Sequence, residues 1–250
     1  MNSAAPARPV ALVADAGFYV GPPLARLLAT RGFDLALGDP SIGLADEVSE
    51  LGAAVVAVEG CRDLAAPGSA QRLVDAALER FGRLDSAVAF SGRIVTGRFM
   101  RSSVEDFRTV MEGCMVAPYE FMKAVLPPMI EARQGQVLVI TSASAARPTP
   151  GAPLYSAARA GATHLVRNVA DEVARHRVQV NAVGTNFMDF PEFRRANKVD
   201  EPGVLEKLEA MVPLGRLGTM EEFAHFCAPY LDGTSRFTTG QFTSYAGGWS

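Results

Sequence analysis

Three side chains near the middle of the sequence have the types and spacing expected for proton transfer. Ser142 ends an apolar run, and Tyr155 and Arg159 follow it four residues apart. Residues four apart share one face of a helix, so the guanidinium would lie beside the phenol. A permanent positive charge favours the phenolate, the form that acts as a base, although burial opposes ionisation. A Tyr–Arg pair alone is more often ordinary packing, but Ser142 at a strand end favours a tyrosine base whose substrate oxygen the serine holds.

Short apolar runs alternate with helical patterns along the whole chain. Strands are predicted at 10–13, 34–37, 54–58, 86–90, 136–142, 178–183 and within 240–248, and helices at 22–30, 104–132 and 153–175. The strand runs are apolar throughout, as in strands buried on both faces. This alternation predicts an α/β, Rossmann-like, doubly wound parallel sheet. Ligands of such folds bind outside the carboxyl ends of the strands, where Ser142 lies.

The domain organisation is predicted to be simple. A chain of 250 residues with 48% hydrophobic residues can bury one large core, and no linker divides it. We therefore expect one domain over 1–250. Residues 1–8 are expected to form a loose leader, and 187–212, rich in polar residues, proline and phenylalanine, a lid or substrate loop.

Composition argues against several classes of function. The net charge of −3 is spread over interspersed residues, which argues against a nucleic-acid partner. No apolar run reaches the roughly 18 residues of a membrane span, and no hydrophobic signal core is present, so we expect a cytoplasmic protein without a membrane partner. The three cysteines and three histidines have no metal-ligand spacing, so we expect no metal.

Four segments resemble the short-chain dehydrogenase/reductase family over essentially the whole chain. They are "ITSASAARPTPGAPLYSAARAGA", "VNAV", "VPLGRLGTMEEFA" and the closing "AGGW". The resemblance implies a catalytic serine at Ser142 and a catalytic tyrosine at Tyr155. In that family a lysine follows the tyrosine and binds the nicotinamide ribose, whereas this chain has Arg159.

Further departures from the family pattern lie around the expected nucleotide site. The glycine-rich turn reads "ADAGFYVG", in which Asp15 would face the pyrophosphate and Tyr19 would occupy space on the nicotinamide side. Cys114 aligns with the asparagine of the family's proton relay, and Thr185-Asn186 replaces a Pro-Gly pair. These departures indicate that no cofactor is bound.

One group within this superfamily, the halohydrin dehalogenases, is similar in all these respects. The resemblance implies that Tyr155, activated by Arg159, takes the proton from the hydroxyl of a vicinal haloalcohol while Ser142 holds the oxygen. The alkoxide then displaces the halide and closes an epoxide, and the reverse reaction opens epoxides with small anions. The expectation is a cofactor-independent carbon–halogen lyase.

The resemblance also implies a halide site. It places Tyr19 from the first turn beside Asn186, Phe187 and Met188 from the loop after the sixth strand. Backbone N–H groups and aromatic edges suit a leaving halide. Ala14 stands where that group has a threonine, so the hydroxyl that braces the turn is missing.

Other residues have candidate roles at the same end of the sheet. Phe90, Ser144 and Trp249 are candidates for the substrate pocket, and Trp249 is expected to pack on its own subunit or across the interface of a homotetramer. Asp15 is expected to cap the following helix, and Asp39 to be a solvated acid at a strand end.

Two alternatives remain open. The first is an atypical NAD(P)-dependent short-chain oxidoreductase, which would need a phosphate cradle that Asp15 and Tyr19 argue against. The second is a catalytically silent Rossmann-like binder of small ligands. The complete spacing of Ser142, Tyr155 and Arg159 argues against this second alternative.

Overall fold

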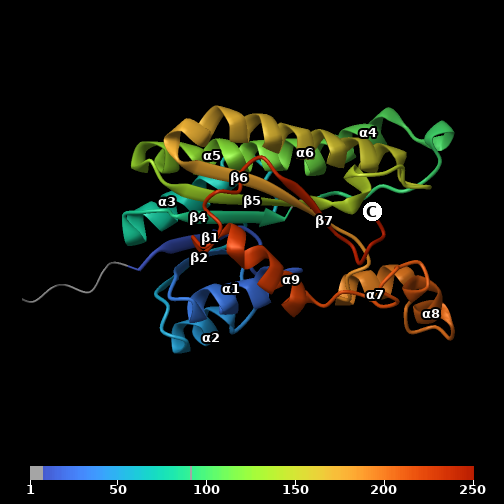
Figure 1. Cartoon of the computed structure of the whole chain (residues 1–250), viewed down its shortest axis with the longest axis horizontal. Coiled ribbons are helices and arrows are strands. Elements are labelled where there is room, and N and C mark those ends of the chain that lie inside the picture. The colour runs from blue at the N-terminus through green and yellow to red at the C-terminus, as the bar shows by residue number, and fades with distance from the viewer. Residues whose placement is uncertain (1–7, 91) are drawn as a thin grey trace, which may run out of the picture.

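A single parallel sheet forms the centre of the molecule (Figure 1). The computed structural model describes residues 8–90 and 92–250, so the expected leader lies outside the described residues except for its last position. Within those ranges the strand order is β3-β2-β1-β4-β5-β6-β7. The strands are β1 (Val10–Val13), β2 (Asp34–Gly38), β3 (Val55–Val58), β4 (Ser86–Phe90), β5 (Gly135–Ser142), β6 (Val178–Thr185) and β7 (Phe242–Tyr245). This confirms the predicted single-domain, Rossmann-like α/β fold.

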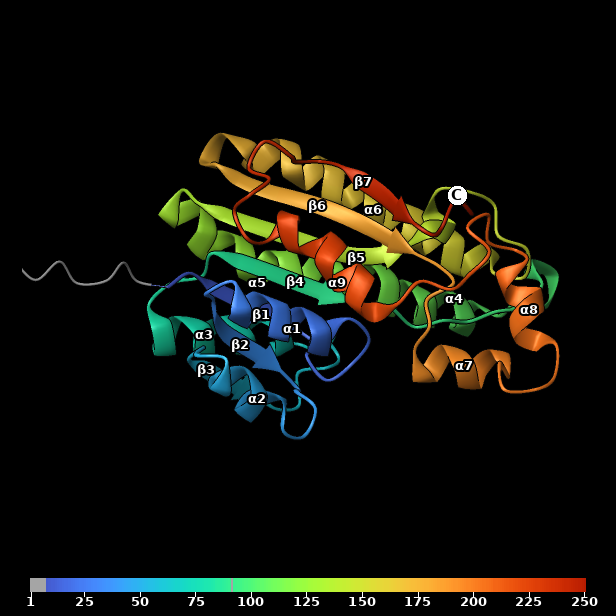
Figure 2. The ribbon, with the colours of Figure 1, turned by 60° about the horizontal axis from the view of Figure 1, so that its bottom comes forward.

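Helices cover both faces of the sheet (Figures 1 and 2). One face carries α3 (Ser69–Phe81), α5 (Ala117–Ala132) and α6 (Pro153–Val173), and the other carries α1 (Gly21–Thr30), α2 (Leu44–Glu50) and α9 (Met220–Cys227). Each layer has its own buried cluster, with Leu73 and Phe121 in the first and Leu24 and Phe223 in the second. Burial on both faces explains why the strand sequences are apolar throughout.

The predicted helix over 104–132 is continuous but not regular. It consists of α4 (Val104–Met111), a π-helical turn η2 (Glu112–Val116) and α5. A capping box between Ser103 and Asp106 begins it. A Cβ at Gly113 would lie 2.5 Å from the Arg93 backbone nitrogen, so the π-turn passes close to the segment after β4. Such turns often lie near functional sites.

The segment predicted as a lid contains two short helices. They are α7 (Pro191–Asn197) and α8 (Val204–Glu209), which lie beyond the carboxyl ends of the strands (Figure 2). Single turns of 3-10 helix complete the chain: η1 (Phe99–Arg101), η3 (Ala143–Ala145), η4 (Ala174–His176) and η5 (Ala228–Tyr230). In the described part of the chain, no helix has both the length and the hydropathy needed to cross a membrane.

Candidate active site

The candidate catalytic residues lie at the carboxyl ends of the central strands. Ser142 is the last residue of β5 and pairs in register with Thr185, the last residue of β6. Helix α6 begins with Pro153 in its first turn, where the missing N–H of proline leaves no donor unsatisfied. Tyr155 and Arg159 therefore lie in the first two turns of α6, directly after the loop that leaves Ser142.

Arg159 and Tyr155 are in contact, as their spacing predicts. The side chain of Arg159 is 0% exposed, and its Cζ lies 5.1 Å from the centroid of the Tyr155 ring and 6.0 Å from that of Phe90. A Cβ at Gly92 would come within 2.1 Å of Nη2 of Arg159, so only glycine lets the backbone approach the guanidinium this closely. The arrangement places a buried positive charge beside the phenol.

Hydrogen bonds fix the orientation of Ser142. Its side chain is buried, with 7% exposed, and its Oγ accepts from the backbone nitrogen of Ser144 at 3.2 Å and from Ser144 Oγ at 2.9 Å. Ser142 Oγ donates to the carbonyl oxygen of Thr185 at 3.4 Å. The hydroxyl is therefore held between η3 and the neighbouring strand.

Tyr19 fills the turn between β1 and α1. Its φ of 54° lies in the left-handed region, and only 8% of the residue is exposed. Its hydroxyl donates to Thr185 Oγ1 at 2.8 Å, and its ring centroid lies 4.6 Å from that of Phe90 and 4.8 Å from that of Phe190. Burial raises the pKa of the Tyr19 phenol well above its ordinary value. Tyr19 is therefore a neutral, packed side chain.

Both acids near the first turn have partners in the protein. Asp15 forms an ion pair with Arg62 at 3.4 Å, and burial raises the pKa of its carboxyl despite that partner. The expectation that Asp15 caps α1 is wrong, because Val20 occupies the N-cap and no side chain caps the helix. Asp39 accepts two backbone N–H groups of the loop after β3, at 2.6 and 2.7 Å, so it holds that loop.

Three of the four residues predicted to bind a halide line one cavity. Asn186, Phe187 and Met188 line a cavity of about 100 Å³, whereas Tyr19 is not among its lining residues. The backbone N–H of Phe187 donates to Asn186 Oδ1 at 3.0 Å, and Phe187 itself has a φ of 54°. The N–H that an anion would use at this position is thus already bonded.

Trp249 packs within its own chain. Its ring centroid lies 5.7 Å from that of Phe187, and Arg147 Cζ lies 4.7 Å from the centroid of the indole. Arg147 also donates to the carbonyl oxygen of Trp249 at 2.7 Å. These contacts fix the C-terminal segment beside the loop after β6.

Two residues important to this geometry were not predicted as site residues. Thr185 joins the first turn to the candidate catalytic serine, because its hydroxyl accepts from Tyr19 and its carbonyl accepts from Ser142. Gly92 makes room for Arg159. The only available signal was position, since both residues follow apolar runs predicted as strands.

Cysteines and possible metal ligands are dispersed. Cys61, Cys114 and Cys227 are buried free thiols. Among the residues that the structure describes, no three His, Cys, Asp or Glu side chains are grouped to hold a metal ion. Cys114 lies in the π-turn, and its Sγ is 3.8 Å from the carbonyl oxygen of Arg93.

Comparisons with known proteins relate the whole chain to reductases and dehydrogenases. Residues 20–250 match the family model described as enoyl-(acyl carrier protein) reductase. The 3-oxoacyl-[acyl-carrier-protein] reductase FabG of Vibrio cholerae is 30% identical over 254 residues, which cover 96% of each chain. Acetoin dehydrogenase from Enterobacter cloacae superposes with a TM-score of 0.84 at 27% identity, over 97% of this chain and 96% of that one. A structure described as "Dehalogenation enzyme" superposes with a TM-score of 0.82 at 27% identity, over 98% of this chain and 99% of that one.

These comparisons correct the expected function. The expectation of a cofactor-independent carbon–halogen lyase, a halohydrin dehalogenase acting on haloalcohols, is wrong, because the matched family and the named curated relative are reductases. The identity of 27% to the dehalogenation enzyme equals that to the acetoin dehydrogenase and does not separate the two. The physical reason for the error is that Ser142, Tyr155 and Arg159 provide the same proton transfer in a dehalogenation and in a reduction. These residues therefore do not distinguish the two reactions. The chain belongs to the short-chain dehydrogenase/reductase superfamily, whose members bind small-molecule substrates.

Proposed function

We propose that the chain is an atypical oxidoreductase of this superfamily, acting on the oxygen of a small alcohol or carbonyl compound. Tyr155 exchanges the proton with that oxygen, donating it to a carbonyl or accepting it from a hydroxyl. Ser142 Oγ hydrogen-bonds the same oxygen and fixes its position. The observation that carries this proposal is the buried guanidinium of Arg159, 5.1 Å from the Tyr155 ring.

The relatives support the kind of substrate. One is named a reductase of a 3-oxoacyl group and another a dehydrogenase of acetoin. We infer from these names that the substrate of this chain is also a ketone or the corresponding secondary alcohol. Small ketones and their alcohols, such as diacetyl and acetoin, are therefore the first compounds to test.

The proposed reaction takes its two electrons from NADH or NADPH, and the first turn can accept such a nucleotide only after Tyr19 moves away from Thr185. The Tyr19 ring occupies the corner beside Phe90, and the partly buried Asp15 adds negative charge where a pyrophosphate needs N–H donors. The turn is also tightly packed, since a Cβ at Gly17 would lie 2.4 Å from the carbonyl oxygen of Asp39. A dinucleotide could enter only if the Tyr19 side chain left Thr185.

The test is a nucleotide-dependent turnover assay. The purified protein is mixed with diacetyl and NADH or NADPH, and the nucleotide absorbance is followed in parallel for Tyr155→Phe. The proposal predicts consumption that requires both the ketone and Tyr155. Release of halide from a haloalcohol without any nucleotide, at a rate that depends on Tyr155, would overturn it.

One observation favours a second candidate, a binder of small ligands without catalysis. Tyr19 fills the turn between β1 and α1 and bonds to Thr185, and a silent protein has no need of an open cofactor site. This candidate predicts no turnover with any nucleotide. It also predicts that Arg159→Ala leaves ligand affinity unchanged.

We propose that the chain assembles as a homotetramer. Large apolar side chains are exposed on η1, α4 and α5, among them Phe99, Met100, Phe107 and Tyr119. Exposed apolar groups of this kind on neighbouring elements favour burial against another subunit. Light scattering at micromolar concentration would show a tetramer, and a monomer would contradict the proposal.

A further inference from the structure

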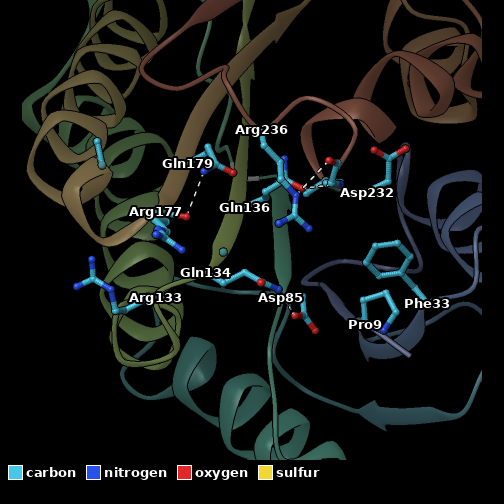
Figure 3. A pocket seen from close by; sticks show the side chains of 14 residues that line it. Pro9, Phe33, Asp85, Arg133, Gln134, Gln136, Arg177, Gln179, Asp232 and Arg236 are labelled. Carbon is cyan, nitrogen blue, oxygen red and sulfur yellow. Dashed lines mark hydrogen bonds between the residues drawn. The ribbon is translucent and has the colours of Figure 1, made fainter. Parts of the chain in front are cut away.

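A second cavity lies at the opposite end of the sheet from the candidate active site. It has a volume of about 440 Å³ and is lined by residues at the amino ends of β1, β2, β4, β5 and β6 and by the segment after η5 (Figure 3). Gln136 lines it, whereas Ser142 is six residues further along β5. At about 3.3 Å per residue, the two sites are roughly 20 Å apart. The cavity is therefore separate from the crevice of the proposed function.

Three arginines from different segments line this cavity. Arg133 is the C-cap of α5, Arg177 is the C-cap of η4, and Arg236 follows η5. Within residues 8–90 and 92–250, none of the three forms an ion pair with a carboxylate, whereas many other arginines of the chain do. A guanidinium is always charged and binds phosphate or carboxylate oxygens through a planar fork of donors.

The acids of the cavity do not cancel this charge, because each is neutralised by an arginine outside the cavity lining. Asp85 accepts from Nε and Nη2 of Arg83 at 2.8 and 2.6 Å. It also accepts from the Val10 backbone and from Gln134, so both oxygens are occupied. Asp232 is paired with Arg31. The cavity consequently carries a net positive charge.

A hydrogen bond between Gly233 and Gln136 holds the segment after η5 beside the cavity. Gln136 is only 6% exposed, and its Oε1 accepts from the backbone nitrogen of Gly233 at 2.7 Å. Its Nε2 is enclosed by protein atoms, so Gln136 positions this segment and does not contact a ligand. Arg236 Nε donates to the carbonyl oxygen of the same Gly233 at 3.2 Å. The side chains of Gln136 and Arg236, both labelled in Figure 3, thus bond to the same residue, Gly233, at the cavity.

We propose that this cavity binds a small phosphate-bearing molecule. A guanidinium binds phosphate oxygens through charge-assisted hydrogen bonds, and the three arginines reach the cavity from three different segments. Arg236, Arg133 and Arg177 would supply the positive charge. The volume exceeds that of a bare phosphate and lies within the usual range for small-molecule sites, about 300–1,000 Å³. The cavity therefore has room for an organic group beside the phosphate.

The experiment measures the binding of inorganic phosphate as the simplest probe. Calorimetric titration at constant ionic strength compares the wild type with Arg236→Gln and Arg167→Gln. The second variant removes the same charge from an exposed arginine of α6 outside the cavity. Loss of one charge-assisted contact is expected to raise Kd about tenfold or more in Arg236→Gln and to leave Arg167→Gln unchanged.

Two outcomes would overturn the proposal. One is equal phosphate affinity in both variants, and the other is an equal effect of chloride at the same ionic strength. Circular dichroism of Arg236→Gln controls for folding, and Arg133→Gln provides a second variant at a different wall of the cavity. Because the measurement needs no turnover, its result is independent of the proposed oxidoreductase activity.

Discussion

The approach of the Gly92 backbone to Arg159 allows a sharp test of the candidate active site. An added Cβ in Gly92→Ala would lie 2.1 Å from Nη2 and 3.0 Å from Cζ of the guanidinium. Restoring an ordinary contact of 3.4 Å requires the Nη2 atom to withdraw by about 1.3 Å. Arg159 is fully buried, so this movement disturbs its packing, at a cost of roughly 1–3 kcal/mol for an overpacked site. A misplacement of about 1 Å near reacting groups lowers rates about 10²-fold.

We therefore expect Gly92→Ala to lower kcat/KM for ketone reduction about 10²-fold. The matched control is Gly97→Ala, because Gly97 has a comparable φ of 146°, against 158° for Gly92, and its Cβ would meet nothing within 4 Å. Both variants are assayed by nucleotide consumption, and thermal denaturation records their folding. Near-normal rates in Gly92→Ala, or equal losses in both variants, would refute the role given to the position of Arg159.

The remaining predictions concern the proton-transfer pair and two titrating side chains. Tyr155→Phe should lower kcat 10²–10⁴-fold without changing the denaturation midpoint. Arg159→Lys should retain more activity than Arg159→Ala, because lysine keeps the positive charge beside the phenol. Steady-state kinetics measures both effects. Tyr19→Phe should cost about 1 kcal/mol in urea denaturation at pH 8, through one lost hydrogen bond. Burial raises the pKa of Tyr19 in the folded protein above its ordinary value of 10.0, so just above pH 10 only the unfolded protein ionises this phenol. The stability advantage of the wild type over Tyr19→Phe should therefore shrink by about 1.4 kcal/mol per pH unit above pH 10. Hydrogen bonds from Arg216 lower the pKa of Glu222 to about 2. The wild type should therefore be more stable than Glu222→Gln above pH 4.5 and should lose this difference as the pH falls towards 2. Acid denaturation of the two proteins measures it.

Much of the fold follows from local patterns. Strands buried on both faces are recognisable as apolar runs, and the predicted strand at 86–90 has the bounds of β4. The local patterns predict no helix at α2, α3 or α9, although an amphipathic pattern is present in the sequence of α3. The π-turn at Cys114 packs against the segment after β4, a tertiary contact that local patterns do not encode.

The candidate site was predictable only where it depends on one element. The contact between Tyr155 and Arg159 follows from their spacing on one helix. The bonds of Thr185 to Tyr19 and Ser142 depend on the register of β5 with β6 and on the path of the first turn, so spacing could not predict them. The error about the reaction has a different origin. A positioned tyrosine moves a proton in either chemistry, and the identity of the bond that breaks is set by the ligand in the crevice.

Whether the chain is an oxidoreductase can be tested by measuring whether its Tyr155-dependent reaction requires a nicotinamide nucleotide. Wild type and Tyr155→Phe are incubated with diacetyl plus NADPH, and separately with a haloalcohol in the absence of nucleotide. We expect Tyr155-dependent oxidation of NADPH in the first mixture and no halide in the second. Halide release in the second mixture, with no nucleotide consumed in the first, would contradict it.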